Sequence, residues 1–255
     1  MIGLTSMPSS FFGGLWHILR HNYPLFFEGL KFTLILAVVG TIFGLVISLM
    51  LVVFKTQKID RFSHLSIRLL KRFTYRFSVF YVGFFRGTPM LVQAMIFYYG
   101  LGHLGIRIPI LLAGLIIVSL NTAAYLTEVL RAGLLGVDVG QREAAESLGM
   151  SNAQVYRKIL LPQALKNMVP AIGNELVVNI KDTAVLSVIG VAELFYMGRA
   201  VASATYRHYE AFIIVSIIYL LTVMVAVYAL KYIALWFGKA AIDPLKSESE
   251  GILYD

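Results

Sequence analysis

Residues 143–165 read EAAESLGMSNAQVYRKILLPQAL, a polar stretch inside a chain that is otherwise mostly apolar. Residues 143–148 are compatible with a helix. Gly149 then permits a left-handed or otherwise sharp turn, and Ser151 or Asn152 can cap a second helix. The stretch therefore predicts a helix, a hinge and a second helix.

The second half of this stretch predicts how the loop rejoins the rest of the chain. Val155, Ile159 and Leu160 place an apolar stripe on the second helix. Pro162 is expected to end that helix or to bend it into the next segment, because proline lacks the backbone N–H and restricts the residue before it. On this pattern alone, an ordinary helix capping a bundle and a helix pressed into a partner's groove remain equally good interpretations.

Composition indicates a membrane protein. Of 255 residues, 58% are hydrophobic and only 14% charged, whereas about a quarter of an average soluble domain is charged. Several apolar runs reach the roughly 20 residues that cross a bilayer. The chain has no cysteine, which excludes disulfides, cysteine-ligated zinc and a thiol nucleophile.

We predict an all-α integral membrane protein with about five transmembrane helices and a cytoplasmic loop that contains residues 143–165. The first apolar run lacks a cleavage site and is interpreted as a retained span rather than a signal peptide. The predicted spans cover residues 25–54, 88–104, 109–131, 165–190 and 210–237.

A sixth span over residues 62–82 is disfavoured, because basic side chains are costly at the centre of a membrane. The second span is short and could begin earlier, near Phe77. The basic residues of the disfavoured stretch are Arg68, Lys71, Arg72 and Arg76.

The basic residues also predict orientation. Residues 55–87 hold eight Lys or Arg against one acid, and residues 131–166 hold five more. The positive-inside rule places both segments in the cytoplasm, with the N-terminus outside and the C-terminus inside. This asymmetry accounts for the net charge of +8 without nucleic-acid binding.

Three regions follow from this topology. Residues 1–24 are an external segment with an interfacial helix over 10–23, residues 25–237 form the transmembrane domain, and residues 238–255 are a cytoplasmic tail. The interfacial helix is predicted because its aromatic and aliphatic side chains share one face.

The fourth span carries ionisable groups, which are costly in a membrane and therefore functional candidates. Glu175, Asn179 and Asp182 stand at i, i+4 and i+7, on one helical face. Glu175 or Asp182 could take the ammonium group of an amino acid, and Asn179 and Thr183 could orient the rest. Lys181 lies on a neighbouring face, where pairing with Asp182 or with another helix is slightly favoured over a substrate contact.

The third span supplies a candidate opposite wall. Asn121 and Thr122 could contact a substrate or make a hydrogen bond between helices, and the two interpretations are equally good. Glu128 stands three residues before Arg131, so a structural ion pair is favoured there. Gln93 in the second span stays undecided. The scattered histidines do not form a metal site.

Four motifs resemble a known family. Glu143-Ala144-Ala145, three residues, Gly149, nine residues and Ile159-Leu160-Leu161-Pro162 resemble the signature loop of the membrane subunits of ABC importers. Within that class the chain resembles the bacterial polar amino acid permeases, such as the histidine, arginine, glutamine, glutamate, cystine and opine systems. The residues that carry the closer resemblance are Arg86-Gly87-Thr88-Pro89, Asn121-Thr122-Ala123-Ala124-Tyr125 and Lys181-Asp182-Thr183.

The resemblance implies a multi-pass protein of the bacterial inner membrane, in which the loop is a coupling helix seated on a separate ATPase. Glu143 would make a polar contact, while Ala144, Ala145 and Gly149 would permit close approach. It also implies a second permease subunit, identical or homologous, and a separate extracytoplasmic substrate-binding protein. No phosphate-binding loop is present, so ATP and Mg²⁺ would bind the partner. This chain is therefore not expected to be an enzyme or to bind a cofactor or a metal.

The sequence favours two other functions less. An ion-gradient-driven secondary transporter could use Glu175, Lys181 and Asp182 as a proton or sodium site, but no inverted repeat is visible. An intramembrane enzyme lacks a credible nucleophile–base pair or metal set. An importer of a basic or polar amino acid is the favoured interpretation.

Overall fold

A computed structural model describes residues 8, 10–57 and 64–236, and the side chains of residues 152, 165–167 and 234–236 are not described. All regular structure in these ranges is helical. The elements in chain order are α1 (Phe11–Thr56), α2 (Leu65–Gly87), α3 (Met90–His103), α4 (Ile110–Leu135), α5 (Val139–Ser147), α6 (Asn152–Gln154), the π-helical η1 (Val155–Leu160), α7 (Leu161–Asp182), the 3-10 helical η2 (Thr183–Ile189), α8 (Leu194–Thr205) and α9 (His208–Trp236). The predicted tail, residues 238–255, lies outside the described residues.

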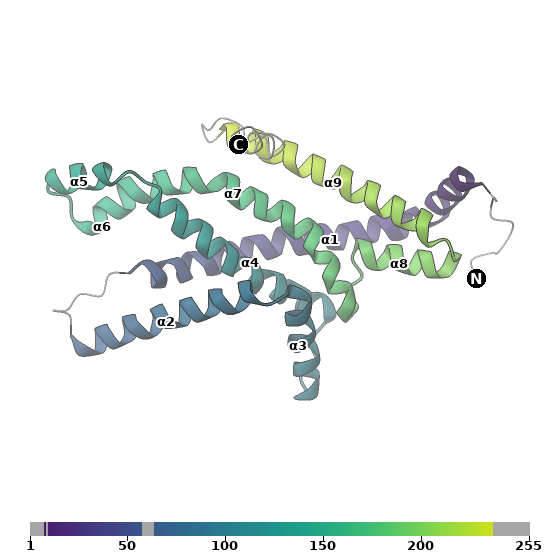
Figure 1. Ribbon diagram of the computed structural model, residues 1–255, viewed down its shortest axis with the longest axis horizontal. Helices are drawn as coiled ribbons and strands as arrows, with labels where there is room; N and C mark the ends of the chain where they lie inside the picture. The colour runs from purple at the N-terminus through teal and green to yellow at the C-terminus, as the bar shows by residue number, and fades with distance from the viewer. Residues whose placement is uncertain (1–7, 9, 58–63, 237–255) are drawn as a thin grey trace, which may run out of the picture.

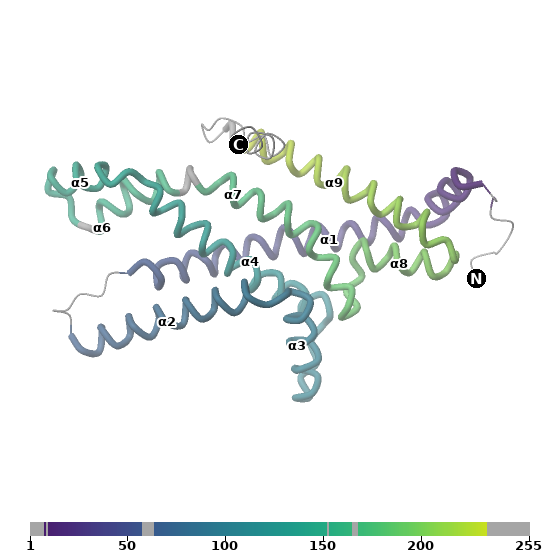
Figure 2. The backbone as a smooth tube through the Cα atoms, viewed as in Figure 1, coloured from purple at the N-terminus to yellow at the C-terminus, as the bar shows by residue number. Residues whose placement is uncertain are grey.

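The molecule is elongated, with α1, α2, α4, α7 and α9 running roughly along its long axis (Figure 1). The loop of α5 and α6 lies at one end, and α8 with the start of α1 lies at the other. Figure 2 traces α1 along most of the length between these ends. The long helices of the molecule therefore share one approximate direction.

Length and apolar composition agree with the predicted all-α membrane fold. Three helices qualify as spans by themselves, over Phe11–Thr56, Ile110–Leu135 and His208–Ile233. Two further pairs qualify together but are bent, Leu65–Gly87 with Met90–His103 by 108° and Met168–Ile189 with Leu194–Thr205 by 55°. The described residues thus provide three to five crossings.

The helix predicted over residues 10–23 is not a separate element. Ser10 caps α1 by accepting a hydrogen bond from the backbone N–H of Gly13 (3.2 Å), and the helix continues through Pro24 to Thr56. The cause is packing, because the buried side chains of Ile18 and Phe26 belong to one apolar cluster with residues of α8 and α9. A single helical face is therefore buried across the expected boundary.

The second predicted span falls on α3, and the alternative earlier start near Phe77 lies within α2. The basic stretch expected in the cytoplasm forms the first half of α2, and α2 packs against α1 and α4. The hydroxyl groups of Ser78 and Tyr81 donate to the carbonyl oxygens of Leu51 (3.0 Å) and Leu120 (2.7 Å). Four of the five basic residues of α2 lie in its first twelve residues, and in the mostly apolar remainder that enters the bundle only Arg86 is basic. At 14 residues, or about 21 Å, α3 is too short to cross alone.

The region between the last two spans, expected as a loop, contains α8. A left-handed Gly190 (φ +91°) ends η2, and the Glu193 side chain caps α8 by accepting from the backbone N–H groups of Phe195 (2.8 Å) and Tyr196 (2.7 Å). The phenol of Tyr219 on α9 also donates to Glu193 (3.0 Å). One fully buried carboxylate therefore fixes α8 against α9.

Close contact between α1 and α4 forms the centre of the bundle. A Cβ atom added at Gly44 would lie 2.8 Å from the Cβ of Thr122, and one at Gly40 would overlap the side chain of Val118. Glycine at these two positions lets the helices approach closely, which brings Thr122 beside α1.

Candidate functional site

A cavity of about 380 Å³ lies where α7 faces α4 and the α2–α3 junction. Its lining residues are Thr88, Pro89, Met90, Asn121, Tyr125, Glu175, Val178, Asn179 and Asp182. Four of the six predicted substrate residues therefore meet at one cavity, which is within the size range of small-molecule sites. The other two, Thr122 and Thr183, do not line it.

The acidic wall of the cavity comes from α7. Glu175 and Asp182 are seven residues apart, or two turns, so both project from the same side of the helix. Glu175 is partly buried and Asp182 is exposed. No ion pair among the described residues involves either carboxylate. The cavity thus presents two acceptor groups without a cation bound to them by the chain.

Asn179 reaches the cavity but is held by other helices. Its amide nitrogen donates to the hydroxyl oxygens of Thr41 (2.8 Å) and Thr122 (2.9 Å). Thr122 is fully buried, so its side chain links α4 to α7 rather than facing a ligand. Thr183 is also fully buried, and its hydroxyl donates to the carbonyl oxygen of Ile180 (3.1 Å).

The opposite wall depends on a contact that sequence reasoning missed. Asn121 donates through its amide to the side-chain oxygen of Gln93 (3.0 Å). The amide of Gln93 in turn donates to the backbone carbonyl and the hydroxyl of Thr88 (2.9 and 2.8 Å). Gln93 therefore holds the junction of α2 and α3 against α4. The sequence identifies Thr88 and Pro89 only as part of a motif. Gly87 and Pro89 are local signals for a break in the helix, but they do not specify that this break faces α7.

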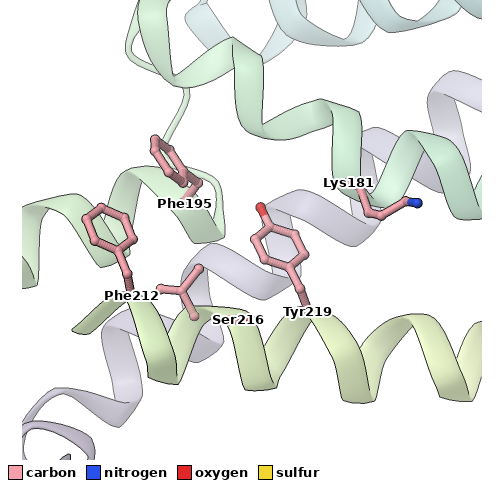
Figure 3. A pocket seen from close by; sticks show the side chains of 6 residues that line it. Lys181, Phe195, Phe212, Ser216 and Tyr219 are labelled. Atoms are coloured by element: carbon pink, nitrogen blue, oxygen red, sulfur yellow. The ribbon is translucent and has the colours of Figure 1, made fainter. Parts of the chain in front are cut away.

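Lys181 lies at a second, more apolar cavity of about 340 Å³. Figure 3 shows Lys181 on α7 nearest to Tyr219 of α9, with its amine pointing away from the other labelled side chains; Ser216 and Phe212 lie farther along α9, and Phe195 is at the start of α8. Within the described part of the chain, Lys181 forms no ion pair with Asp182. The predicted separation of Lys181 from the face of Glu175 is confirmed.

The ion pair predicted for Glu128 is present. Its carboxylate accepts from Arg131 (2.8 Å) and also pairs with Lys55 at the end of α1. This group joins α1 and α4 near the α5–α6 end of the molecule, so Glu128 has a structural role. The described residues contain no cluster of three His, Cys, Asp or Glu that could hold a metal ion.

The loop of residues 136–160 forms the predicted helix, hinge and helix. Helix α5 ends before Gly149, which is left-handed (φ +75°). Ser151 then caps the second helix, since its hydroxyl accepts from the N–H of Gln154 (3.4 Å) and the Gln154 side chain accepts from the N–H of Ser151 (2.8 Å). This reciprocal pair is a capping box. Pro162 does not end the helix, because it falls in the first turn of α7 after the π-helical turn.

The exposed surface of α5 differs from the prediction at one residue. Glu143 and Ala144 are exposed, whereas Ala145 is only 4% exposed and α5 packs against η1. Ala145 therefore supports the loop from inside. Leu148, which was not singled out, is 82% exposed at the tip. Leu148 is therefore an exposed apolar side chain between the helix and the hinge.

The sequence is similar to those of known transport permeases over most of its length. The arginine transport system permease protein of Bacillus subtilis (strain 168) is 37% identical over 225 residues, which span 88% of this chain and 94% of that protein. A Rickettsia conorii protein, provisionally named a glutamine transport system permease, is 38% identical over 83% of this chain and 93% of its own length.

A solved structure shares both fold and sequence. The structure titled as an amino acid ABC transporter with histidines superposes with a TM-score of 0.78, at 35% identity, over 86% of this chain and 97% of that one. Residues 62–239 match the family described as "Binding-protein-dependent transport system inner membrane component". The chain belongs to this family of membrane transport subunits.

Proposed function

We propose that this chain is the permease subunit of an ATP-driven amino-acid importer and that substrate passes through the cavity beside α7. The observation that carries the proposal is the meeting of Glu175, Asp182 and Asn121 at one cavity in a chain of this transport family. An amino acid offers an ammonium group to acceptors and a carboxylate to donors. The two carboxylates supply the acceptors, whereas the amide nitrogen of Asn121 on the facing wall already donates to Gln93 (3.0 Å) and to the carbonyl oxygen of Phe85 (3.4 Å).

The loop at the α5–α6 end is the proposed contact with a separate ATPase. Glu143 supplies a polar contact, and Ala144 and Gly149 leave room for a close surface. The buried Ala145 holds α5 on η1, and the exposed Leu148 adds an apolar anchor. ATP and Mg²⁺ bind the ATPase. A movement of the ATPase would reach α7 through η1, because the chain continues directly from η1 into α7.

The assembly that we propose has two permease subunits, either two copies of this chain or one copy with a homologue, two ATPases and a separate extracytoplasmic substrate-binding protein. The loop end faces the cytoplasm, and α8 with the N-terminus lies outside. This is a multi-pass arrangement in a bacterial inner membrane. The distribution of Lys and Arg supports the orientation, since residues 64–86 and 131–158 hold nine of the 18 Lys and Arg in the described ranges.

We infer that the substrate is a basic amino acid. Two carboxylates at one cavity, neither of them in an ion pair among the described residues, favour a ligand that carries more positive than negative charge. The arginine system of Bacillus subtilis among the relatives supports this choice. A neutral polar amino acid such as glutamine is the second candidate, because its ammonium group needs only one acceptor.

The test compares uptake of L-arginine and L-glutamine by the reconstituted complex carrying Glu175→Gln. This substitution keeps the shape of the side chain and removes its charge. Losing a charged hydrogen bond should weaken L-arginine binding by about ten- to a hundredfold at subsaturating concentration, with a smaller effect on L-glutamine. Glu28→Gln on α1 is the control, since Glu28 is exposed and lies outside the cavity. Unchanged L-arginine uptake in Glu175→Gln would remove the basis for a basic substrate.

An ion-gradient-driven transporter is less well supported by the geometry. Its proposed site needed Glu175, Lys181 and Asp182 together, but Lys181 lies at the other cavity. The family to which the chain belongs consists of components of binding-protein-dependent systems, which also argues against that alternative.

A further inference from the structure

Arg86 is a cation at an unexpected depth. It lies 21 residues after the first residue of α2, which corresponds to about 31 Å along the helix. Every other basic residue of α2 lies in its first twelve residues. The Arg86 side chain is exposed, and it takes part in no ion pair among the described residues. A guanidinium so far along a membrane helix is expected to face protein, water or a ligand rather than lipid.

The surroundings of Arg86 connect it to the cavity. Its guanidinium carbon lies 5.4 Å from the centroid of the Tyr125 ring, and Tyr125 lines the cavity. The chain continues directly from Arg86 into Thr88 and Pro89, which line the cavity as well. Arg86 itself is not a lining residue, so its guanidinium stands at the edge of the cavity, beside the ring of Tyr125.

Stacking on a tyrosine does not by itself indicate a ligand contact. Arg199 lies at the same distance, 5.4 Å, from the ring centroid of Tyr196 on α8, and Tyr196 lines neither cavity. What distinguishes Arg86 is the pair of carboxylates, Glu175 and Asp182, at the cavity that its stacking partner borders.

We propose that Arg86 binds the α-carboxylate of the amino acid in the cavity, while Glu175 and Asp182 hold its ammonium group and any basic side chain. This inference rests on the proposed function. A planar guanidinium matches a carboxylate with two parallel hydrogen bonds, and stacking on Tyr125 limits its orientations before the substrate arrives. One cation and two anions then complement the charges of a basic amino acid.

The competing interpretation is that Arg86 only balances the charge of Glu175. The two roles differ in what they predict for a ligand that has no carboxylate. If Arg86 recognises the carboxylate, such a ligand gains nothing from it. If Arg86 balances Glu175, removing Arg86 strengthens the attraction of Glu175 for any ammonium group. Binding then becomes tighter both for ligands that carry a carboxylate and for ligands that do not.

The experiment measures competition binding to the purified complex of permease and ATPase in lipid nanodiscs, without the substrate-binding protein. Two matched pairs are used, L-arginine with agmatine and L-glutamine with 4-aminobutanamide, in which the second compound lacks only the carboxylate. The wild-type complex should bind the amino acid more tightly than its analogue. Arg86→Gln should weaken binding of the amino acid about ten- to a hundredfold and leave the analogue unchanged. Arg86→Lys keeps the charge without the planar fork. The ratio of its affinity for the amino acid to its affinity for the analogue should therefore lie between the ratios of the wild type and of Arg86→Gln.

Arg199→Gln is the matched control, because it removes a stacked arginine whose stacking partner does not line the cavity, and it should leave the ratio of the two affinities at the wild-type value. The proposal would be overturned if Arg86→Gln weakened binding of both compounds equally, weakened binding of neither, or bound both more tightly. If Arg86→Gln does not assemble with the ATPase, a wild-type ratio in Arg86→Lys would overturn it instead. Failure of the wild-type complex to bind any amino acid would count against the proposed function itself. This result is separate from failure of the Arg86 proposal, because it is obtained without any variant.

Discussion

The amide of Asn179 on α7 donates a hydrogen bond of 2.8 Å to the hydroxyl of Thr41 on α1, 138 positions earlier in the chain. The same amide contacts Thr122 on α4. Three helices therefore meet at one buried polar contact beside the cavity. Although Asn179 lines the cavity, its amide nitrogen is committed to this contact, so we expect it to position α7 rather than to select the substrate.

Thr41→Val should lower the stability of the complex without changing its affinity for L-arginine. The change removes one interhelical hydrogen bond, which is worth about 0.6 kcal/mol on average in membrane proteins and at most about 1.7. Thermal unfolding of the purified complex measures the first effect, and equilibrium binding measures the second. Thr56→Val is the control, since its hydroxyl donates only to Val52 of its own helix (2.7 Å). Weaker L-arginine binding at unchanged stability would assign Asn179 to the substrate instead.

Local signals predicted the parts of the site that lie within one helix or one loop. The spacing of Glu175 and Asp182 placed both on one face, and Gly149 with Ser151 predicted the hinge and the cap. Contacts between distant segments could not be read from the sequence. The bond from Asn179 to Thr41 and the one from Asn121 to Gln93 depend on which helices are neighbours, and hydrophobic periodicity does not specify that.

Two features were mispredicted because local evidence pointed elsewhere. The basic residues of α2 predict a cytoplasmic segment, but four of the five lie in its first twelve residues, and the mostly apolar turns that follow, which include Arg86, belong to a helix that packs on α1 and α4. Glu193 was overlooked because an acid after a glycine-containing turn looks like part of a loop. In the structure its carboxylate is fully buried and caps α8.

Gly149→Val should uncouple ATP hydrolysis from transport. Gly149 has φ +75°, and nothing lies within 4 Å of a Cβ atom added there, so the cost comes from the backbone alone. A β-branched residue resists the left-handed region by about 1–2 kcal/mol. The assay is stimulation of ATPase activity by the substrate-binding protein and L-arginine. Gly149→Asn, which tolerates this conformation better, should retain more stimulation. Equal activity of the two variants would show that the hinge conformation is unimportant.

Leu148→Asp should weaken attachment of the ATPase while leaving the permease folded. The side chain is 82% exposed, so a charge there costs the isolated chain little, but it would be buried unpaired in the proposed contact. Co-purification of the ATPase with the variant measures attachment. Leu104→Asp is the control, because Leu104 is 72% exposed and follows α3, away from the loop end. Loss of the ATPase from the control as well would mean that the effect is not local.

The two ends of the molecule should lie on opposite sides of the membrane. The chain has no cysteine, so single cysteines can be labelled without background. Ala153→Cys, on α6, should react with an impermeant maleimide only from the cytoplasmic side. Tyr206→Cys, an exposed position between α8 and α9, should react only from outside. Reversed labelling would place the loop outside the cell and exclude its contact with an ATPase.

The central claim is that this chain carries an amino acid across the membrane with energy from ATP hydrolysed by a partner. It is tested most directly by uptake of labelled L-arginine and L-glutamine into proteoliposomes that contain the complex purified through this chain, with the substrate-binding protein on the uptake side. The account predicts uptake of one of them that requires ATP on the side of the α5–α6 loop and persists when ionophores collapse the ion gradients. Uptake that continues without ATP and stops with the ion gradient would contradict it.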